Sequence, residues 1–324
     1  MPQGIWPTVL LAFIISLAAG PLFIRIRQRQ RLGQQIREDG PAHHLKKAGT
    51  PTAGGVLFLA AAAGALLLRG HGTPLVGLAA LLALGNGFIG WLDDRAKMRQ
   101  GRSLGLKARN KIAGQALFTA LFAALLHRSG LYNPVVALPF SDLTLDLGWF
   151  YPFFIFLIIL ATTNAVNLSD GIDGLAGGTA IIALLAFLYI ALESGRPDLA
   201  LFCAALIGGT FGFLLYNLHP ARIFMGDVGS LALGGALAAA AILSKAELSL
   251  LLIGGIYVIE ALSVILQVLS FQLTGRRLLL MAPLHHHFEL KGWSEWRVVT
   301  AFWGLTFIFA LGGLLEWWLR GSQL

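Results

Sequence analysis

Long stretches of apolar residues recur along the whole chain, and short polar segments separate them. A helix that crosses the hydrocarbon core of a bilayer needs about 20 such residues, whereas the strands of a membrane β-barrel would show shorter segments of alternating polarity. The pattern therefore predicts an all-α integral membrane protein in which residues 1–324 form a single polytopic domain. We expect about ten transmembrane helices, of 16 to 23 residues each, at 4–26, 52–69, 75–92, 111–127, 149–166, 174–192, 199–217, 228–243, 250–272 and 297–319.

The loops between these stretches differ in charge and in length. If the ten stretches alternate in direction, 19 of the 24 Lys and Arg residues fall on one side, which the positive-inside rule makes cytoplasmic. Both termini are then periplasmic or extracellular. On that outer side only residues 128–148 form a long loop; its alternating segment 143–147 is compatible with a small hairpin or with a plain connector.

Composition agrees with a membrane protein and narrows the chemistry. Only 12% of residues are charged, against about 25% in soluble domains, and the mean hydropathy is +0.74. The net charge of +8 is better explained by basic cytoplasmic loops than by nucleic acid, so we expect no nucleic-acid partner. The single cysteine, Cys203, excludes a disulfide framework and a cysteine-based metal site. The eighth stretch is rich in Gly and Ala, which favours close helix packing over contact with lipid.

Four polar residues recur at every third position after the fifth stretch. They are Asn164, Asn167, Asp170 and Asp173, and on a helix or a tight helical turn they would share one face. Polar groups beside a bilayer core are costly, so they are candidates for function. The alternative is that Asp170 or Asp173 merely caps the next helix.

Three further carboxylates fall on the same side. Asp93 and Asp94 end the third stretch, and two adjacent acids at a helix C-terminus call for a compensating cation. Asp227 lies between two glycines, Gly226 and Gly229. Hard oxygen ligands favour Mg²⁺ over zinc. The alternatives are a solvated pair of aspartates and, for Asp227, a helix N-cap.

Basic and imidazole groups complete the candidate site. Three consecutive histidines, 285–287, cannot converge on one ion from a helix, so hydrogen bonding to an anionic substrate is favoured over a structural role and over zinc. Lys47, Lys97 and Lys111, together with Arg109, could attract phosphate groups. The alternative for these residues is charge that serves only to orient the chain in the membrane.

Taken together, these motifs resemble the phospho-N-acetylmuramoyl-pentapeptide branch of the polyprenyl-phosphate N-acetylhexosamine-1-phosphate transferases. The matching segments run through nearly the whole chain: Gly49-Thr-Pro-Thr-Ala-Gly-Gly55, which contains Thr52, then Asp93-Asp94, residues 164–174, Phe224-Met-Gly-Asp227 and Pro283-Leu-His-His-His-Phe-Glu289.

The resemblance implies a reaction and its participants. Phospho-N-acetylmuramoyl-pentapeptide would pass from its UDP-linked precursor to undecaprenyl phosphate, giving lipid I and UMP with Mg²⁺ as cofactor. The enzyme would be a multi-pass protein, and by implication a homodimer, of the bacterial inner membrane.

The resemblance also assigns residues to roles. Asp227 would bind the metal, with Asp93 and Asp94 serving the metal or the lipid phosphate. Asp93 or Asp94 would act as base or orienter, and the catalytic residues would also include His285 and His286, near the sugar and phosphates. The other candidates would bind the substrates: Lys47, Thr52, Lys97, Lys111, Asn164, Asn167, Asp170, Asp173, Asn217 and Phe224.

Several alternatives stay open at this point. Direct attack by the lipid phosphate on the sugar-bearing phosphorus is preferred over a two-step route through an aspartyl-phosphate. A sibling transferase that uses UDP-N-acetylglucosamine is the nearest rival function. An ion-coupled transporter or flippase is more distant, because such proteins often place acids at the bilayer midplane and carry inverted repeats.

Overall fold

The computed structural model describes residues 4–30, 49–100 and 105–321. These residues form a bundle of helices with one small hairpin. The helices are α1 (Ile5–Arg29), α2 (Gly55–Leu68), α3 (Pro74–Gln100), α4 (Ala108–Arg128), α5 (Tyr151–Leu168), α6 (Leu175–Glu193), α7 (Pro197–Asn217), α8 (Gly226–Leu243), α9 (Ser249–Ile253), α10 (Gly255–Thr274), α11 (Leu284–Leu290) and α12 (Glu295–Gly321), with a short 3₁₀ helix η2 (Gly148–Phe150) before α5.

Eight of these helices are long and apolar enough to cross a membrane: α1, α3, α5 with η2, α6, α7, α8, α10 and α12. The all-α membrane fold is therefore confirmed. Each of the ten predicted stretches holds a helix, but α2 has only 14 residues and α4 is not among the eight. The count of ten spans thus stays a prediction.

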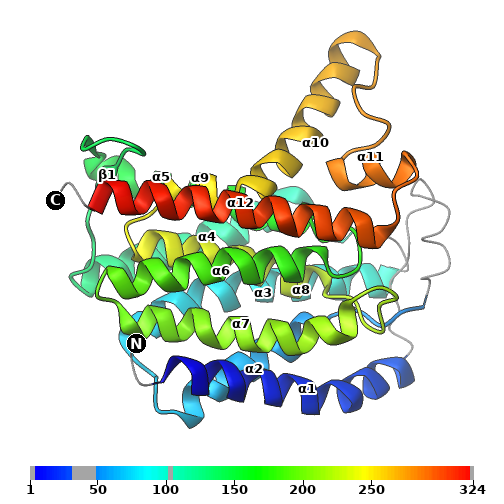
Figure 1. The fold of residues 1–324 in the computed structure, drawn as a ribbon, viewed down its shortest axis with the longest axis horizontal. Helices are drawn as coiled ribbons and strands as arrows, with labels where there is room; N and C mark the ends of the chain where they lie inside the picture. Colours follow the sequence, from blue (N-terminus) through cyan, green and yellow to red (C-terminus); the bar gives the residue numbers. More distant parts are fainter. Residues whose placement is uncertain (1–3, 31–48, 101–104, 322–324) are drawn as a thin grey trace.

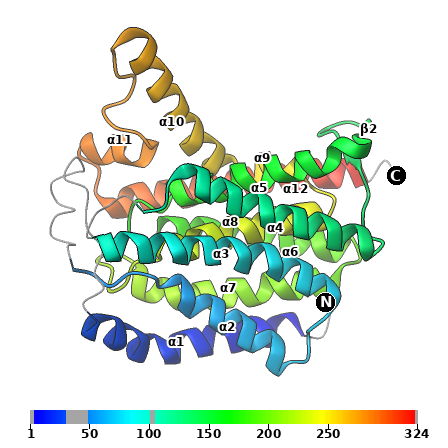
Figure 2. The same cartoon turned by 180° about the vertical axis from the view of Figure 1, so that it is seen from behind.

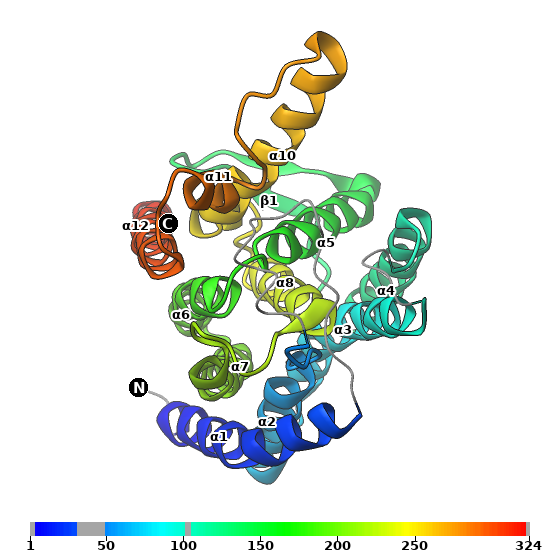
Figure 3. The ribbon, with the colours of Figure 1, turned by 90° about the vertical axis from the view of Figure 1, so that its right-hand side faces the viewer.

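Helix α8 lies at the centre of the bundle, and α3, α5, α6 and α7 pack around it (Figure 3). Its glycines allow this close approach. A Cβ atom at Gly234 would lie 2.5 Å from the Cα of Thr163 in α5, and one at Gly235 would lie 2.5 Å from the carbonyl oxygen of Leu82 in α3. The small residues of this stretch serve helix packing, as its composition predicted.

Most helices run side by side along the long axis of the molecule, but α10 leaves the bundle at an angle (Figure 1). The ninth predicted stretch is broken at Gly254, where α9 ends and α10 begins one residue later. Along α10 the apolar side chains are exposed, among them Ile265, Leu269 and Phe271. After α10 the chain passes through α11 and reaches the start of α12 at Glu295.

The two strands β1 (Val135–Ala137) and β2 (Thr144–Asp146) pair antiparallel, with Val136 opposite Leu145. The hairpin interpretation of this loop is therefore confirmed. The hairpin, the start of α1 and the end of α12 lie at one end of the bundle (Figures 1 and 2). We call this end the distal end, because the candidate site lies at the other.

Helix α3 extends further than its hydrophobicity predicts. The apolar stretch ends at Leu92, but the helix continues to Gln100, so Asp93 and Asp94 lie inside it and not at its C-terminus. The expected repulsion with the helix dipole is thereby avoided. At a rise of 1.5 Å per residue, Asp94 lies roughly 9 Å before the helix end.

Candidate active site

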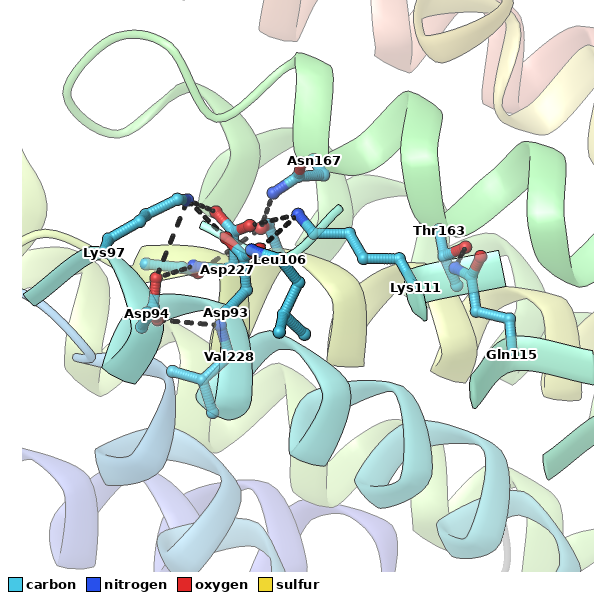
Figure 4. A network of polar contacts seen from close by, with 12 residues as sticks. Asp93, Asp94, Lys97, Leu106, Lys111, Gln115, Thr163, Asn167, Asp227 and Val228 are labelled. Carbon is cyan, nitrogen blue, oxygen red and sulfur yellow. Dashed lines mark hydrogen bonds and ion pairs between the residues drawn. The ribbon is translucent and has the colours of Figure 1, made fainter. Parts of the chain in front are cut away.

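Helices α3 and α8 approach closely at the end where three aspartates meet. Gly90 makes this contact possible, because a Cβ atom there would lie 2.1 Å from the carbonyl oxygen of Asp227. Asp93 and Asp94 follow Gly90 by about one turn of α3, so their side chains face the first turn of α8. Carboxylate oxygens of Asp93, Asp94 and Asp227 all lie within 4.8 Å of one another (Figure 4).

Asp94 binds the N-terminus of α8. Its two carboxylate oxygens accept hydrogen bonds from the backbone N–H groups of Asp227 and Val228, each at 3.1 Å. The N-cap residue of α8, Met225, makes no side-chain cap of its own. Asp94 therefore supplies the cap from a neighbouring helix. Asp227 lies in the first turn, so it is not the N-cap that the sequence allowed.

Asp93 is enclosed by groups that donate hydrogen bonds or carry positive charge. Its Oδ1 atom accepts a hydrogen bond from the N–H of Leu106 at 2.7 Å and lies 3.1 Å from the Nζ atom of Lys111. Its Oδ2 atom lies 2.8 Å from the Nζ atom of Lys97. Gly105 packs directly on this carboxylate. Only 1% of the Asp93 side chain is exposed, so a group as large as a phosphate has little access to it.

Asp227 is the most accessible of the three carboxylates, with 13% of its side chain exposed. Lys97 of α3 donates a hydrogen bond to its Oδ1 atom at 2.8 Å, and Lys111 of α4 donates one to its Oδ2 atom at 2.9 Å. Both lysines also contact Asp93, so two cations bridge three acids (Figure 4). The structure thus brings together five of the predicted site residues: Asp93, Asp94, Asp227, Lys97 and Lys111.

The donor set fits a divalent cation. It consists of carboxylate oxygens from two helices, and hard oxygen ligands of this kind suit Mg²⁺. The larger exposed fraction of its side chain makes Asp227 the carboxylate best placed to hold an ion, with one of the other two as a second ligand.

The α5–α6 connection lies beside this cluster. Asn167 donates a hydrogen bond to the Oγ atom of Ser230 in α8 at 2.8 Å, and Asn164 donates one to its own helix at Leu160. Burial, reinforced by the charges of Asp227 and Asp94, raises the pKa of Asp170 well above its ordinary value. Asp170 therefore experiences the same electrostatic field as the aspartate cluster.

Asp173 belongs to a second group of polar residues. Its Oδ2 atom accepts a hydrogen bond from the N–H of Ala221 at 3.1 Å and lies 3.0 Å from the Nδ1 atom of His219. The same His219 nitrogen lies 3.2 Å from Glu295, the first residue of α12. Neither His219 nor Glu295 stands in a polar repeat or an acidic pair, so no pattern in the sequence marks them as functional residues.

Asn217 and Phe224 connect the α7–α8 loop to its neighbours through hydrogen bonds. Asn217 accepts a hydrogen bond from the N–H of Gly174 at 3.1 Å and donates one to the carbonyl of Ile223 at 2.9 Å. The N–H of Phe224 bonds to the carbonyl of Pro51. The Gly174 contact also shows how α6 begins: its N-cap is this glycine, so neither Asp170 nor Asp173 caps that helix.

Thr52 lies against the start of α8, whereas Lys47 falls outside the described residues. Thr52 is buried, and its carbonyl oxygen accepts a hydrogen bond from the Nε atom of Arg27 at 3.1 Å. A Cβ atom at Gly226 would lie 2.9 Å from the Oγ1 atom of Thr52 and 2.7 Å from Asp94. Thr52 is therefore a close neighbour of the aspartate cluster.

The three histidines lie on the short helix α11 and diverge. His285 is fully buried, with its Nδ1 atom 3.2 Å from Glu260 of α10 and its ring packed on Gly171 of the α5–α6 connection. His286 Nδ1 lies 2.7 Å from Glu289, and His287 Nδ1 accepts a hydrogen bond from the N–H of Leu280. They have different partners and do not converge on one ion. Nothing in the sequence marked Glu260 as a partner of His285.

Comparison with known proteins matches the glycosyl transferase family 4 model to residues 75–245, a range that contains all three clustered aspartates. Three relatives bear the name phospho-N-acetylmuramoyl-pentapeptide-transferase. The protein from Pelotomaculum thermopropionicum is 52% identical, over 96% of this chain and 97% of its own. Those from Desulforamulus reducens and Geobacillus kaustophilus are 50% and 47% identical, over 97% and 98% of this chain and 97% and 99% of their own.

Proposed function

The chain belongs to glycosyl transferase family 4 as a phosphoglycosyl transferase of the phospho-N-acetylmuramoyl-pentapeptide transferase type, and from this premise we propose its reaction. It transfers phospho-N-acetylmuramoyl-pentapeptide from the UDP-linked precursor to undecaprenyl phosphate, and the products are lipid I and UMP. The reaction takes place at the cytoplasmic face of the bacterial inner membrane and uses Mg²⁺.

The observation that carries the proposal is the cluster of three aspartates bridged by Lys97 and Lys111. Both substrates are polyanions, so a site that joins them must screen their mutual repulsion and the charge that develops on the departing UMP. Lys97 and Lys111 supply two positive charges at the point where the phosphates must meet. If Asp227 held a metal ion, Lys97 or Lys111 could instead bind a phosphate oxygen.

Asp227 would hold Mg²⁺, with Asp93 or Asp94 as the second carboxylate. The bound ion would supply Lewis-acid stabilisation of phosphoryl oxygens. Asp94 fixes the first turn of α8, and thereby the place of Asp227. Asp93 fixes the segment at Leu106 and helps to position Lys97 and Lys111.

The bond changes of the preferred route are simple. An oxygen of the lipid phosphate attacks the sugar-bearing β-phosphorus, a new P–O bond forms, and the bond from that phosphorus to the oxygen of UMP breaks. A phosphate monoester has a second pKa of about 6, so the attacking group is already ionised at neutral pH and needs no general base. Asp93 and Asp94 then act as positioning groups.

The burial of these two aspartates supports the one-step route over an aspartyl-phosphate intermediate. A carboxylate nucleophile must reach the β-phosphorus, but the Asp93 and Asp94 side chains are only 1% and 5% exposed. Both also accept hydrogen bonds from backbone N–H groups, which a covalent phosphate would disrupt.

The remaining substrate groups would lie along the α5–α6 and α7–α8 connections. Asn164, Asn167, Asp170 and Asp173 would line the nucleotide and diphosphate site, and Asn217 and Phe224 would sit near the uracil. His285 and His286 would serve the sugar and phosphates, with His285 placed by its contact with Gly171.

The test is UMP release by purified protein in detergent, with UDP-N-acetylmuramoyl-pentapeptide and undecaprenyl phosphate as substrates. We expect release to require both substrates and Mg²⁺. A transporter would release no UMP under these conditions, because it catalyses no phosphoryl transfer. Faster release from UDP-N-acetylglucosamine would instead identify the sibling activity and overturn the muramoyl specificity.

A further inference from the structure

A second polar site lies at the distal end of the bundle, far along the helices from the aspartate cluster. It is a cavity of about 520 Å³ between the hairpin, the C-terminal end of α6, the α8–α9 connection and the last turn of α12. Cavities of this size suit small ligands. Its lining combines acidic, basic and aromatic side chains, which include Asp142, Glu193, Lys245, Arg320 and Trp318.

The two basic groups of the cavity already have acidic partners. The Nζ atom of Lys245 forms an ion pair with the buried Glu247 and lies 3.0 Å from the hydroxyl of Tyr151. Arg320 lies 3.8 Å from the fully buried Glu316, and its guanidinium covers the ring of Trp317 at 4.5 Å. The positive charges of Lys245 and Arg320 are therefore compensated by buried carboxylates.

The two acidic groups have no such compensation. Asp142 of the hairpin and Glu193 of α6 are exposed. Within the part of the chain that the structure describes, neither carboxylate takes part in an ion pair or a side-chain hydrogen bond. Among the residues that line the cavity, the charge without an ion-pair partner is thus negative, and a cationic ligand would balance it.

The aromatic residues point to the same kind of ligand. Tyr189 and Trp318 line the cavity and are 42% and 60% exposed, so a ligand in the cavity has access to both side chains. Aromatic faces attract ammonium groups, and carboxylates accept hydrogen bonds from them. We propose that this distal cavity binds the ammonium group of a zwitterionic phospholipid, with phosphatidylethanolamine as the simplest such lipid.

A lipid is the source that fits the position of the cavity. It lies where α6 and α12, two of the membrane-crossing helices, end. Tyr and Trp are enriched at this level of membrane proteins, where lipid head groups lie. Exposed Leu185 and Leu315, one turn further along α6 and α12, provide apolar surface for acyl chains. The site is separate from the transferase reaction and does not depend on it.

The test is competition between two lipids for the purified protein, read by native mass spectrometry. The protein in detergent is mixed with equal amounts of phosphatidylethanolamine and phosphatidylglycerol that carry the same acyl chains. Two exposed ion pairs and a cation–π contact together predict a preference of about fivefold for phosphatidylethanolamine in the first bound lipid. The double variant D142N/E193Q should reduce this preference to less than about twofold, since both carboxylates are lost.

A matched control removes the same charge elsewhere on the distal end. The variant D146N/D198N changes one hairpin residue and one residue at the start of α7, neither of which lines the cavity, and it should keep the wild-type preference. Equal binding of the two lipids by the wild type, or an undiminished preference in D142N/E193Q, would overturn the proposal. Thermal unfolding of each variant verifies that these surface changes leave the fold intact.

Discussion

Three aspartates with the same side chain have different surroundings in this site. Asp93 accepts a backbone hydrogen bond and contacts two lysines, Asp94 caps α8, and Asp227 projects between the lysines with the largest exposed fraction. These differences separate the two groups that mainly position the site from the one that is most exposed to a substrate. The three aspartates differ in the groups that they contact, and these contacts cannot be inferred from the residue type alone.

The first prediction concerns Asp227. Replacing it with asparagine keeps the side-chain shape but removes the charge, so turnover should fall by on the order of a thousandfold because charge stabilisation is lost at the reacting phosphates. Titration of UMP release with Mg²⁺ measures this loss. D146N, in the distant hairpin, is the control and should behave as wild type. Near-normal turnover of D227N at ordinary Mg²⁺ would remove Asp227 from the metal site.

The second prediction concerns Asp170 and pH. The raised pKa of its carboxyl means that the folded protein favours the protonated form. The stability that this group contributes is therefore present near pH 4 and is lost as the pH rises through the raised pKa. The asparagine of D170N does not ionise, so this variant does not lose stability in this way as the pH rises. In EDTA, its apparent melting temperature should exceed that of wild type by about 2 °C or more at pH 8.

Thermal unfolding at both pH values tests this expectation. The difference between D170N and wild type should shrink towards pH 4, because the carboxyl is protonated in the folded chain there and, with an ordinary Asp pKa of about 3.9, is about half protonated in the unfolded chain. An equal difference at pH 4 and pH 8 would show that the effect comes from packing and not from ionisation.

Candidate site residues could be predicted from the sequence, but the residues that they contact could not. Asp93, Asp94 and Asp227 could be selected because paired or glycine-flanked acids beside a bilayer are unusual. The roles of His219, Glu260 and Glu295 could not, because a single polar residue in or beside an apolar stretch has no pattern to reveal its partner. Such partners depend on contacts between helices that are distant in sequence.

At the scale of the elements, the third prediction concerns the α3–α8 contact. In the Gly90→Ala variant the added Cβ atom would meet backbone atoms of Asp227 and Val228, so the start of α8 must shift. A displacement of about 1 Å in an active site can cost on the order of a hundredfold in rate. We therefore expect UMP release to fall by about this factor while the protein still folds.

Gly77→Ala is the matched control on the same helix. A Cβ atom at Gly77 would meet nothing within 4 Å, and alanine favours the helix, so activity should be unchanged. Equal activities for the two variants would show that the α3–α8 distance does not matter for turnover. Melting curves of both variants separate a local shift from unfolding.

Helix positions were predicted well and helix ends were not. Apolar length places each helix because lipid and close packing both require it. The end of α3 depends instead on Lys97, which pairs with Asp93 one turn earlier and lets the helix continue past two acids. The break of the ninth stretch at Gly254 likewise depends on tertiary packing, since the flanking residues are apolar on both sides.

For the whole molecule, the fourth prediction concerns orientation. Ser129 and Ser294 are exposed at opposite ends of the bundle, and the only native cysteine, Cys203, is buried. In intact cells, a membrane-impermeant thiol reagent should label Ser129→Cys but not Ser294→Cys, and lysis should expose the second site. The reverse pattern would invert the topology and place the aspartate cluster outside. The two single variants serve as controls for each other.

The division of the loops between two sides could be predicted, because successive spans alternate in direction and Lys and Arg are concentrated in every second loop. The structure agrees that the hairpin, the start of α1 and the end of α12 share the end opposite the aspartates. The number of spans, the homodimer and the inner membrane remain predictions, because each depends on a bilayer or a second copy of the chain.

The pairing of Asp227 with Lys97 and Lys111 has a consequence for the order of loading. If Asp227 holds a divalent ion, that ion must compete with two ammonium groups for the same carboxylate, and a bound diphosphate would offer those ammonium groups a new partner. Binding of the ion would thus release a lysine for the diphosphate, and binding of the diphosphate would release the Asp227 carboxylate for the ion. By thermodynamic linkage, nucleotide should raise the affinity for Mg²⁺ by the same factor as Mg²⁺ raises the affinity for nucleotide. Each of the two should therefore bind more weakly alone than in the presence of the other.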